Sequence, residues 1–331
     1  MNKILKFVLI IAFIISFGET SHGQGGQSFK KHKYTSIGIS INAMNYVGEL
    51  DPGPSFLSPG IKFTKPNIGF TYLRRLAPRY SIRGAASWGM VKGDDYKNAS
   101  FSDKDIHRKF RNLSFRSAIL EFKGDVIIDL WENRGRYTKR PDYTPYFFTG
   151  LAYFHMNPKA KYNGDWVALE PLELEGKSFS LHQIALPVGL GFRYKLGKQW
   201  DLAFEMGWRF TLTDYMDGVS TSYVDKATLS SQAAIDLSDR SGELLGNDEI
   251  ASYVANQGGF ISDPYSSSGQ RINGYGGITA GQPADQRGDK NRDWYIVTGF
   301  HLTYIVPGRI ICPKFRTFHS ELQRKLLAYN E

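Results

Sequence analysis

The sequence is poor in cysteine and in long apolar runs. Its one cysteine, Cys312, cannot form an internal disulfide, and no Cys/His spacing resembles a zinc site. Beyond the N-terminus, no apolar run approaches the roughly 18 residues that a membrane helix requires, and the mean hydropathy is −0.35. These absences exclude disulfide-rich, zinc-dependent and helical membrane proteins.

The N-terminus carries the one strongly apolar stretch. Lys3 and Lys6 precede an apolar run from Phe7 to Phe17, and small residues precede Gln24. This pattern predicts a secretory signal peptide over residues 1–23. The formal net charge of +9 would suit nucleic acid, but an exported protein meets lipid headgroups, glycans and envelope proteins instead. We therefore expect no nucleic-acid partner.

Strict alternation of apolar and small or charged residues is the main positive signal. From His182 to Tyr215 the sequence is HQIALPVGLGFRYKLGKQWDLAFEMGWRFTLTDY, in which Leu190, Phe204 and Met206 lie on one face. The opposite face carries Gly, Ala and a few charges, which suits a confined space better than a solvated surface. An apolar face toward lipid and a narrow polar lumen are typical of a membrane barrel.

Eight runs have the length of roughly 9 to 11 residues that a tilted transmembrane strand requires. They are Thr35–Tyr46, Asn67–Leu76, Tyr80–Val91, Asn112–Phe122, Thr144–His155, Gln183–Tyr194, Asp201–Leu212 and Asp293–Ile305. We predict an all-β fold, an eight-stranded antiparallel transmembrane barrel over residues 24–305, with a ten-stranded barrel as the alternative. The fourth run changes phase, which a bulge near Arg116 would explain, and the fifth is apolar on both faces, which periodicity does not explain. Aromatic residues at strand ends, among them Tyr46, predict an interfacial girdle.

The connections alternate between short and long, as in bacterial outer-membrane barrels, except that the segment after the fourth run, residues 123–143, is moderately long. The longest, residues 213–292, has eleven acids and six bases, a net charge of −5. The segments assigned to the periplasmic side are basic, with Arg74, Arg75 and Arg79 in the first turn. Solvated faces and an acidic periplasmic partner both explain this asymmetry.

Charged residues on the predicted inner faces indicate a structural network in the lumen, with a proton or ion path as the alternative. This set comprises Arg83, Arg116, Glu121, Arg193, Glu205 and Arg209, of which Glu121 depends on the bulge. Confined charges must be paired, because desolvation costs several kcal/mol each. The loop acids Asp214, Asp217 and Asp225 could ligate Ca²⁺, but their spacing matches no loop template. No Gly-x-Ser-x-Gly elbow is present, so we expect no enzyme activity, cofactor or metal.

A basic tail, residues 306–331, follows the last predicted strand and has the pattern of an amphipathic helix. Its stripe of Phe315, Phe318 and Leu322 is flanked by Arg324 and Lys325. Such a helix suits an anionic leaflet, an acidic groove on a partner, or a plug for its own barrel. We predict that the tail and the first turn bind a periplasmic partner.

Several motifs resemble the PorG-type outer-membrane barrel family of Bacteroidetes. They are NYVGEL (45–50), RRLAPRYSIRGAASWGMVKGDD (74–95), RNLSFRSAILEF (111–122), TPYFFTGLAYFHMNPKAKYNGDWVALEPLELEG (144–176) and TLTDYMDGVSTSYVD (211–225). Gly218 stands where we expect a second acid in the last motif. That family belongs to the type IX secretion and gliding machinery. The resemblance implies an outer-membrane barrel that is not an enzyme and that positions a periplasmic ring of PorK lipoprotein and PorN. The alternative is an outer-membrane lipid- or glycan-binding barrel of unrelated role, which the acidic loop favours.

Overall fold

The structure, a computed structural model, describes residues 33–51, 63–101, 106–244, 247–249, 252, 261–262, 270–271, 287–288 and 291–307. The predicted signal peptide and the tail from residue 308 onward lie outside the described residues. In the part of the chain that is described, no helix is both long and apolar enough to cross a membrane.

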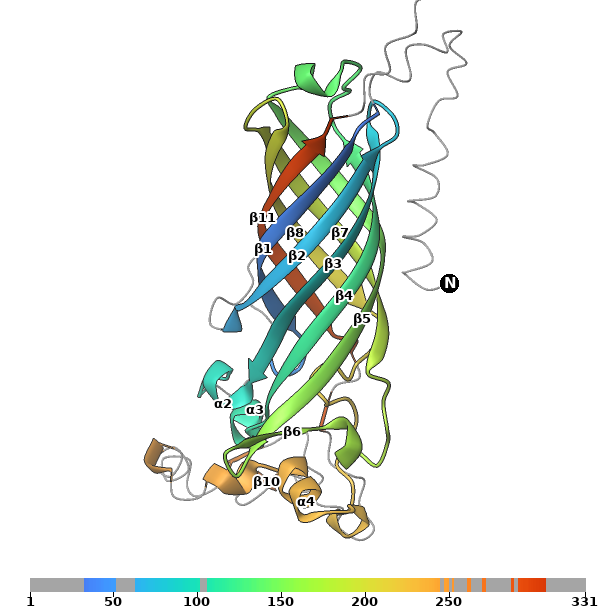
Figure 1. Cartoon of the computed structure of the whole chain (residues 1–331). Coiled ribbons are helices and arrows are strands. Elements are labelled where there is room, and N and C mark those ends of the chain that lie inside the picture. The colour runs from blue at the N-terminus through green and yellow to red at the C-terminus, as the bar shows by residue number, and fades with distance from the viewer. Residues whose placement is uncertain are drawn as a thin grey trace, which may run out of the picture.

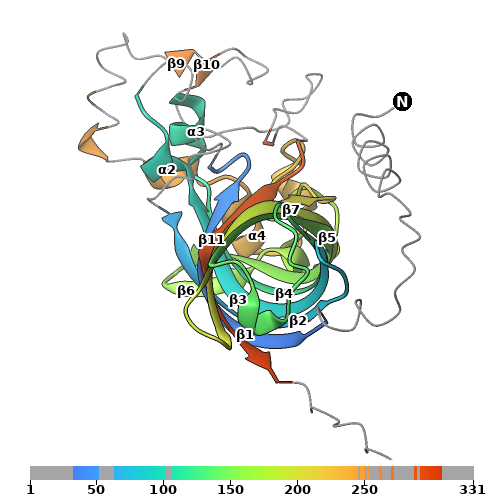
Figure 2. The same cartoon turned by 90° about the horizontal axis from the view of Figure 1, so that it is seen from above.

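Eight antiparallel strands close into a barrel, which Figure 2 shows as a ring seen along its axis. The strands are β1 (Thr35–Val47), β2 (Lys65–Arg75), β3 (Tyr80–Asp94), β4 (Ser114–Asp129), β5 (Tyr143–Tyr162), β7 (His182–Lys195), β8 (Trp200–Thr211) and β11 (Trp294–Val306). The ring closes because β1 pairs with β11 and β4 pairs with β5. The short β6 (Asp165–Ala168) only extends β5 as a hairpin, so the eight-stranded prediction is confirmed over the ten-stranded alternative.

The two ends of the barrel differ, as Figure 1 shows. At the short-turn end lie the connections β2–β3, β4–β5 and β7–β8, with η3 (Tyr137–Lys139) in the second of them. At the long-loop end lie α2 (Asp95–Asn98), α3 (Ile106–Arg111), η4 (Glu170–Leu172), η5 (Lys226–Thr228), α4 (Gln232–Ser238) and η6 (Ser241–Leu244). The two-residue strands β9 (Ile261–Ser262) and β10 (Gln270–Arg271) form a separate pair.

The outer wall is apolar on all eight barrel strands. Each contributes at least one large exposed apolar side chain: Ile41, Phe70, Trp88, Phe122, Leu151, Leu190, Phe204 and Phe300. On β7 and β8 the inward positions between them are buried or half-buried and carry mostly small, polar or charged residues, as the alternation predicts. Tyr46 is an exception among the predicted girdle residues, because its side chain is buried in the interior.

Strand β4 corrects two expectations. Its pairing with β3 runs without interruption from Tyr80↔Ile128 to Asp94↔Ser114, so there is no bulge near Arg116. Glu121 therefore faces the lumen in a regular strand, whereas Arg116 shares the outward face of Leu120 and stacks over the ring of Trp166, 3.7 Å from its centroid. The assignment of Arg116 to the lumen was wrong.

Candidate functional site

A network of buried charges fills the short-turn half of the lumen, with Glu205 at its centre. The Glu205 carboxylate accepts hydrogen bonds from Arg83 and, at 2.5 Å, from the Tyr146 hydroxyl. His301 Nε2 lies 3.6 Å from the same carboxylate. Arg83 is shared, because its Nη2 also lies 2.7 Å from Asp125 Oδ2. The predicted lumen residues Arg83 and Glu205 are thus paired with each other across the barrel.

Two further groups of ion pairs extend this network. Toward the middle of the lumen, Arg209 Nε lies 3.3 Å from Glu121 Oε2, and the Tyr295 hydroxyl donates to the same oxygen at 2.6 Å. Toward the short-turn end, Arg193 lies 3.4 Å from Asp129. The remaining predicted lumen residues therefore all find partners, as confined charges must.

Several members of the network were missed from the sequence. They are Lys123, Asp125, Asp129, Arg140, Asp201 and His301. The predicted fourth strand ended at Phe122, whereas β4 continues to Asp129. The signal was present, because Lys123, Asp125 and Asp129 keep the alternation with the exposed Gly124 and Val126.

An apolar core fills the long-loop half of the interior. It comprises strand residues such as Phe115, Ile119, Phe154 and Met156, together with loop residues such as Leu169, Leu174, Met216, Val219 and Leu237. The loop residues belong to a cap, formed by residues 163–181 and 213–244 with Arg287 and Gly288. The interior is therefore occupied by side chains in both halves, as expected for a barrel of eight strands.

The cap is held by a buried ion pair. Arg287 Nη1 lies 2.9 Å from Glu175 Oε1, and both side chains are almost completely buried. Glu175 also accepts hydrogen bonds from the backbone amides of Ser220 and Thr221. Burial raises the pKa of Glu175, but the Arg287 guanidinium and these hydrogen bonds outweigh it and hold the pKa below its usual value.

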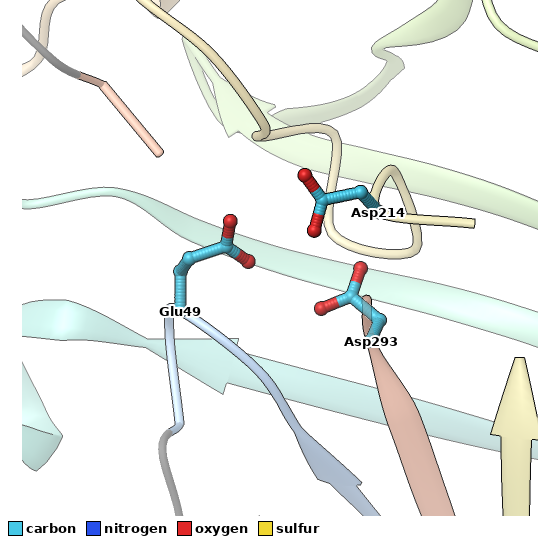
Figure 3. A group of neighbouring side chains, drawn as sticks. All are labelled: Glu49, Asp214 and Asp293. Carbon is cyan, nitrogen blue, oxygen red and sulfur yellow. The ribbon is translucent and has the colours of Figure 1, made fainter. Parts of the chain in front are cut away.

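Acidic side chains meet where the cap joins the barrel rim (Figure 3). Glu49 follows β1, Asp214 follows β8 and Asp293 precedes β11, and one carboxylate oxygen of each lies within 4.8 Å of the others. Three oxygens this close could accept a cation such as Ca²⁺. Of the loop acids weighed from the sequence, Asp214 belongs to this cluster, whereas the exposed Asp225 only caps η5.

Protons are shared at this junction. The Tyr46 hydroxyl oxygen lies 2.7 Å from Asp217 Oδ2 and 2.6 Å from Asp293 Oδ1. A hydroxyl has one proton to donate, so the second contact requires a proton on one of the two carboxyls. Burial, followed by the charges of Asp217, Asp293 and Asp214, raises the pKa of Glu49 to about 12, and burial raises that of Asp217 to about 7.

Backbone conformation and packing explain why position 218, beside this junction, is a glycine. Gly218 has φ +82, and a Cβ there would lie 2.8 Å from the Leu169 side chain. A second acid at this position would therefore be strained and would clash with the cap.

The residues predicted to bind a partner at the short-turn end separate into three groups. Arg74 and Arg79 are exposed. Arg75 is 1% exposed and lies 2.5 Å from Asp129, so its assignment to a partner surface was wrong. The tail residues Phe315, Phe318, Leu322, Arg324 and Lys325 lie outside the described residues.

The β4–β5 connection, residues 130–142, completes this end and was not assigned to a partner surface from the sequence. Arg140 pins it to the β7–β8 turn by donating to the carbonyls of Lys198, Gly197 and Trp200 and to Asp201. The described residues of this end expose seven basic side chains, Lys33, Arg74, Arg79, Arg134, Arg136, Lys139 and Lys198, against two acidic ones, Glu132 and Asp142.

Comparison with known proteins gives a family but no function. The family model described as "Domain of unknown function (DUF6089)" matches residues 26–233. No curated protein matches the chain. Among solved structures, the chain is similar to Neisserial surface protein A, NspA, at 9% identity over 82% of this chain and 96% of that one, with a TM-score of 0.35.

Two other solved structures are similar at the same level. The outer membrane protein OprG of Pseudomonas aeruginosa is 11% identical over 83% of this chain and 99% of that one, with a TM-score of 0.32. The attachment invasion locus protein Ail of Yersinia pestis is 5% identical over 82% and 99%, with a TM-score of 0.33. Likenesses this distant carry no argument about function.

Proposed function

We propose that this chain, a member of the DUF6089 family, is an outer-membrane scaffold rather than an enzyme or a pore. The observation that carries the proposal is the filled lumen. Ion pairs around Glu205 occupy one half and the apolar core around Phe154 occupies the other. A barrel filled in this way acts through its surfaces.

The outer wall supports a membrane location. Large apolar side chains such as Ile41 and Leu151 are more than 60% exposed, and similar residues lie on every barrel strand. A water-soluble protein rarely exposes so large a continuous apolar band, whereas a transmembrane barrel requires one. The predicted signal peptide would deliver the chain to the bacterial envelope.

The short-turn end supports a periplasmic partner. Its exposed bases outnumber its exposed acids among the described residues, and Arg140 holds the β4–β5 connection in a fixed position. Since the N-terminus of β1 and the end of β11 also lie here, the tail starts from the same surface. We propose that this surface and the tail dock on the acidic side of a periplasmic ring. The resemblance to PorG-type barrels suggests ring proteins of the PorK and PorN type, in the type IX secretion machinery.

The test is co-purification of ring proteins with the barrel from membranes. Truncation after Pro307 should leave a folded barrel yet abolish co-purification. A charge-reversed variant, Arg134→Glu with Arg136→Glu and Lys139→Glu, should weaken it while keeping the tail. The matched control carries the same charge change at exposed lysines of the long-loop end, Lys97→Glu with Lys161→Glu and Lys177→Glu, and should bind normally. Undiminished co-purification from both the truncated and the charge-reversed protein would refute the docking proposal.

A deletion in the long connection tests the rival role in lipid or glycan binding. The structure shows where it can be made, because Leu237 and Leu244 are buried in the cap and Arg287 binds Glu175. Removing residues 250–284 spares all of these. Secretion should survive this deletion if the barrel acts as a scaffold, and should collapse if the loop is the binding element.

A further inference from the structure

The outer wall has a notch near the short-turn end. Gly84 and Gly124 are direct neighbours across β3 and β4, and both face outward. A Cβ added at either glycine would meet nothing within 4 Å. The surrounding hollow is lined by Phe70, Tyr72, Ala86 and Phe122, so it is an apolar depression between aromatic rings.

Strand register places a cation beside this notch. Tyr72 pairs with Gly84, and Arg74 pairs with Ile82, one step nearer the short-turn rim on the same outward face. Residues two apart on a strand are about 7 Å apart. Arg74 is exposed and has no acidic partner among the described residues.

Two more bases flank Arg74. Lys33 precedes Thr35, which pairs with Arg74, and is exposed. Arg79 lies in the β2–β3 turn, half exposed, with its Nε 3.4 Å from Glu132 Oε1. The apolar notch thus lies toward the centre of the outer wall, and a positively charged group of residues lies toward its edge.

We propose that this surface, the notch of Gly84 and Gly124 with Arg74 at its rim, binds one anionic phospholipid. An acyl chain lies in the notch and the phosphate faces Arg74, with Lys33 and Arg79 nearby. A lipid fits this surface better than a protein partner does. The apolar notch and the basic residues follow one another along the strands, in the same order as the acyl chain and the headgroup of a phospholipid in a bilayer. The proposal requires that the barrel spans a membrane, but it does not depend on a ring partner.

The test is lipid retention by the full-length protein in detergent, measured by native mass spectrometry. Dipalmitoyl phosphatidylglycerol is the probe, phosphatidylcholine with the same chains tests the headgroup, and glycerol phosphate tests the need for a chain. We expect one retained phosphatidylglycerol per barrel, at least ten-fold weaker retention of phosphatidylcholine, and no retention of glycerol phosphate.

Two variants separate the parts of the site. Gly84→Leu fills the notch and should weaken phosphatidylglycerol retention at least ten-fold, and Gly124→Leu does the same from the neighbouring strand if the first variant does not fold. Arg74→Gln should weaken it about five-fold and leave phosphatidylcholine unchanged.

The controls are Ala118→Leu, also outward on β4 but far from the notch, and Lys161→Gln, an exposed base at the long-loop end. Both should retain lipid as the wild type does. Wild-type retention by folded Gly84→Leu or Gly124→Leu protein, or equal retention of the two phospholipids by the wild type, would overturn the proposal. Neither result bears on ring binding, because the assay contains no ring proteins.

Discussion

In the short-turn half of the interior, Arg83, Asp125 and Glu205 fill the space between the strands, whereas in the long-loop half Phe115 and Phe154 fill it. Both halves are tightly filled, but they tolerate change differently. An apolar core loses stability in proportion to the atoms removed. A charged core loses most when one partner is removed, because the other charge stays buried. The difference indicates that the stability of the charged half depends on intact ion pairs, whereas that of the apolar half depends on the volume its side chains fill.

The largest expected effect is in the charged half. Glu205→Ala leaves Arg83 with Asp125 as its one remaining carboxylate and removes the acceptor of the Tyr146 hydroxyl. We expect a loss of about 3–5 kcal/mol in the free energy of unfolding. Urea unfolding in phospholipid vesicles, followed by the gel shift between folded and heat-denatured protein, measures it. The control Glu132→Ala, at a half-exposed ion pair on the rim, should cost less than about 1 kcal/mol; equal losses would contradict the comparison.

The apolar half should respond slightly less. Phe154 is fully buried and packs edge-on against Tyr295, with ring centroids 5.7 Å apart. Phe154→Ala should cost about 3–4 kcal/mol, since a cavity is left in a region that strands and cap share. Phe154→Leu keeps much of the volume and should cost roughly half as much in the same assay. A loss for Phe154→Ala below 1 kcal/mol would show that the apolar half is loosely packed.

The junction between the apolar half and the cap should depend on pH. The pKa of Asp217 is raised by burial to about 7 in the folded protein, so folding takes up a proton above the unfolded value of about 3.9. The contribution of Asp217 to the stability of the cap is therefore full below that value and is lost as pH rises from about 4 to about 7, by about 1.4 kcal/mol per pH unit. Hydrogen exchange of the amides of residues 216–221 measures it, after correction for intrinsic rates.

Asp217→Asn provides the matched variant for this dependence. It should make the change between about pH 4 and pH 7 less steep without abolishing it, because burial and neighbouring acids raise the pKa of Glu49 to about 12, so that Glu49 contributes both in this range and above pH 7. A cap whose protection is the same at pH 5 and pH 8 in the wild type would contradict the shared-proton interpretation.

The smallest effect is expected when a complete group of polar residues in the charged half is replaced by apolar residues. Glu121→Leu combined with Arg209→Met and Tyr295→Phe removes a complete hydrogen-bonded group. The free energy of unfolding should change by less than about 1 kcal/mol, because no partner is left unsatisfied. Glu121→Leu alone should cost several times more. Equal costs for the single and triple variants would mean that pairing does not decide stability here.

The sequence predicted the outer wall better than the interior. Alternation located all eight strands because every strand meets the same apolar surroundings on its outer face, as Leu190 and Phe204 do. The interior changes character along the barrel, and there periodicity failed. Strand β5 looked apolar on both faces because Phe148 and Phe154 face inward while Leu151 and Tyr153 face outward.

The candidate surfaces were predicted only in part. Arg83 and Glu205 could be assigned to the lumen by phase, but their pairing across the barrel depends on strand order and tilt. Arg74 and Arg75 are adjacent in the sequence, but successive side chains of a strand face opposite sides, so Arg74 faces outward and Arg75 inward. The junction of Glu49, Asp214 and Asp293 joins three segments that lie at least 79 residues apart, so no local pattern could reveal it.

The lock that Arg140 forms between two connections has a mechanical consequence. Its guanidinium joins the β4–β5 connection to the β7–β8 turn through several hydrogen bonds and the buried carboxylate of Asp201. A force applied to either connection is therefore distributed over β4, β5, β7 and β8 instead of bending a single hairpin. If a ring is attached at this end, the two joined connections resist bending at the point of attachment.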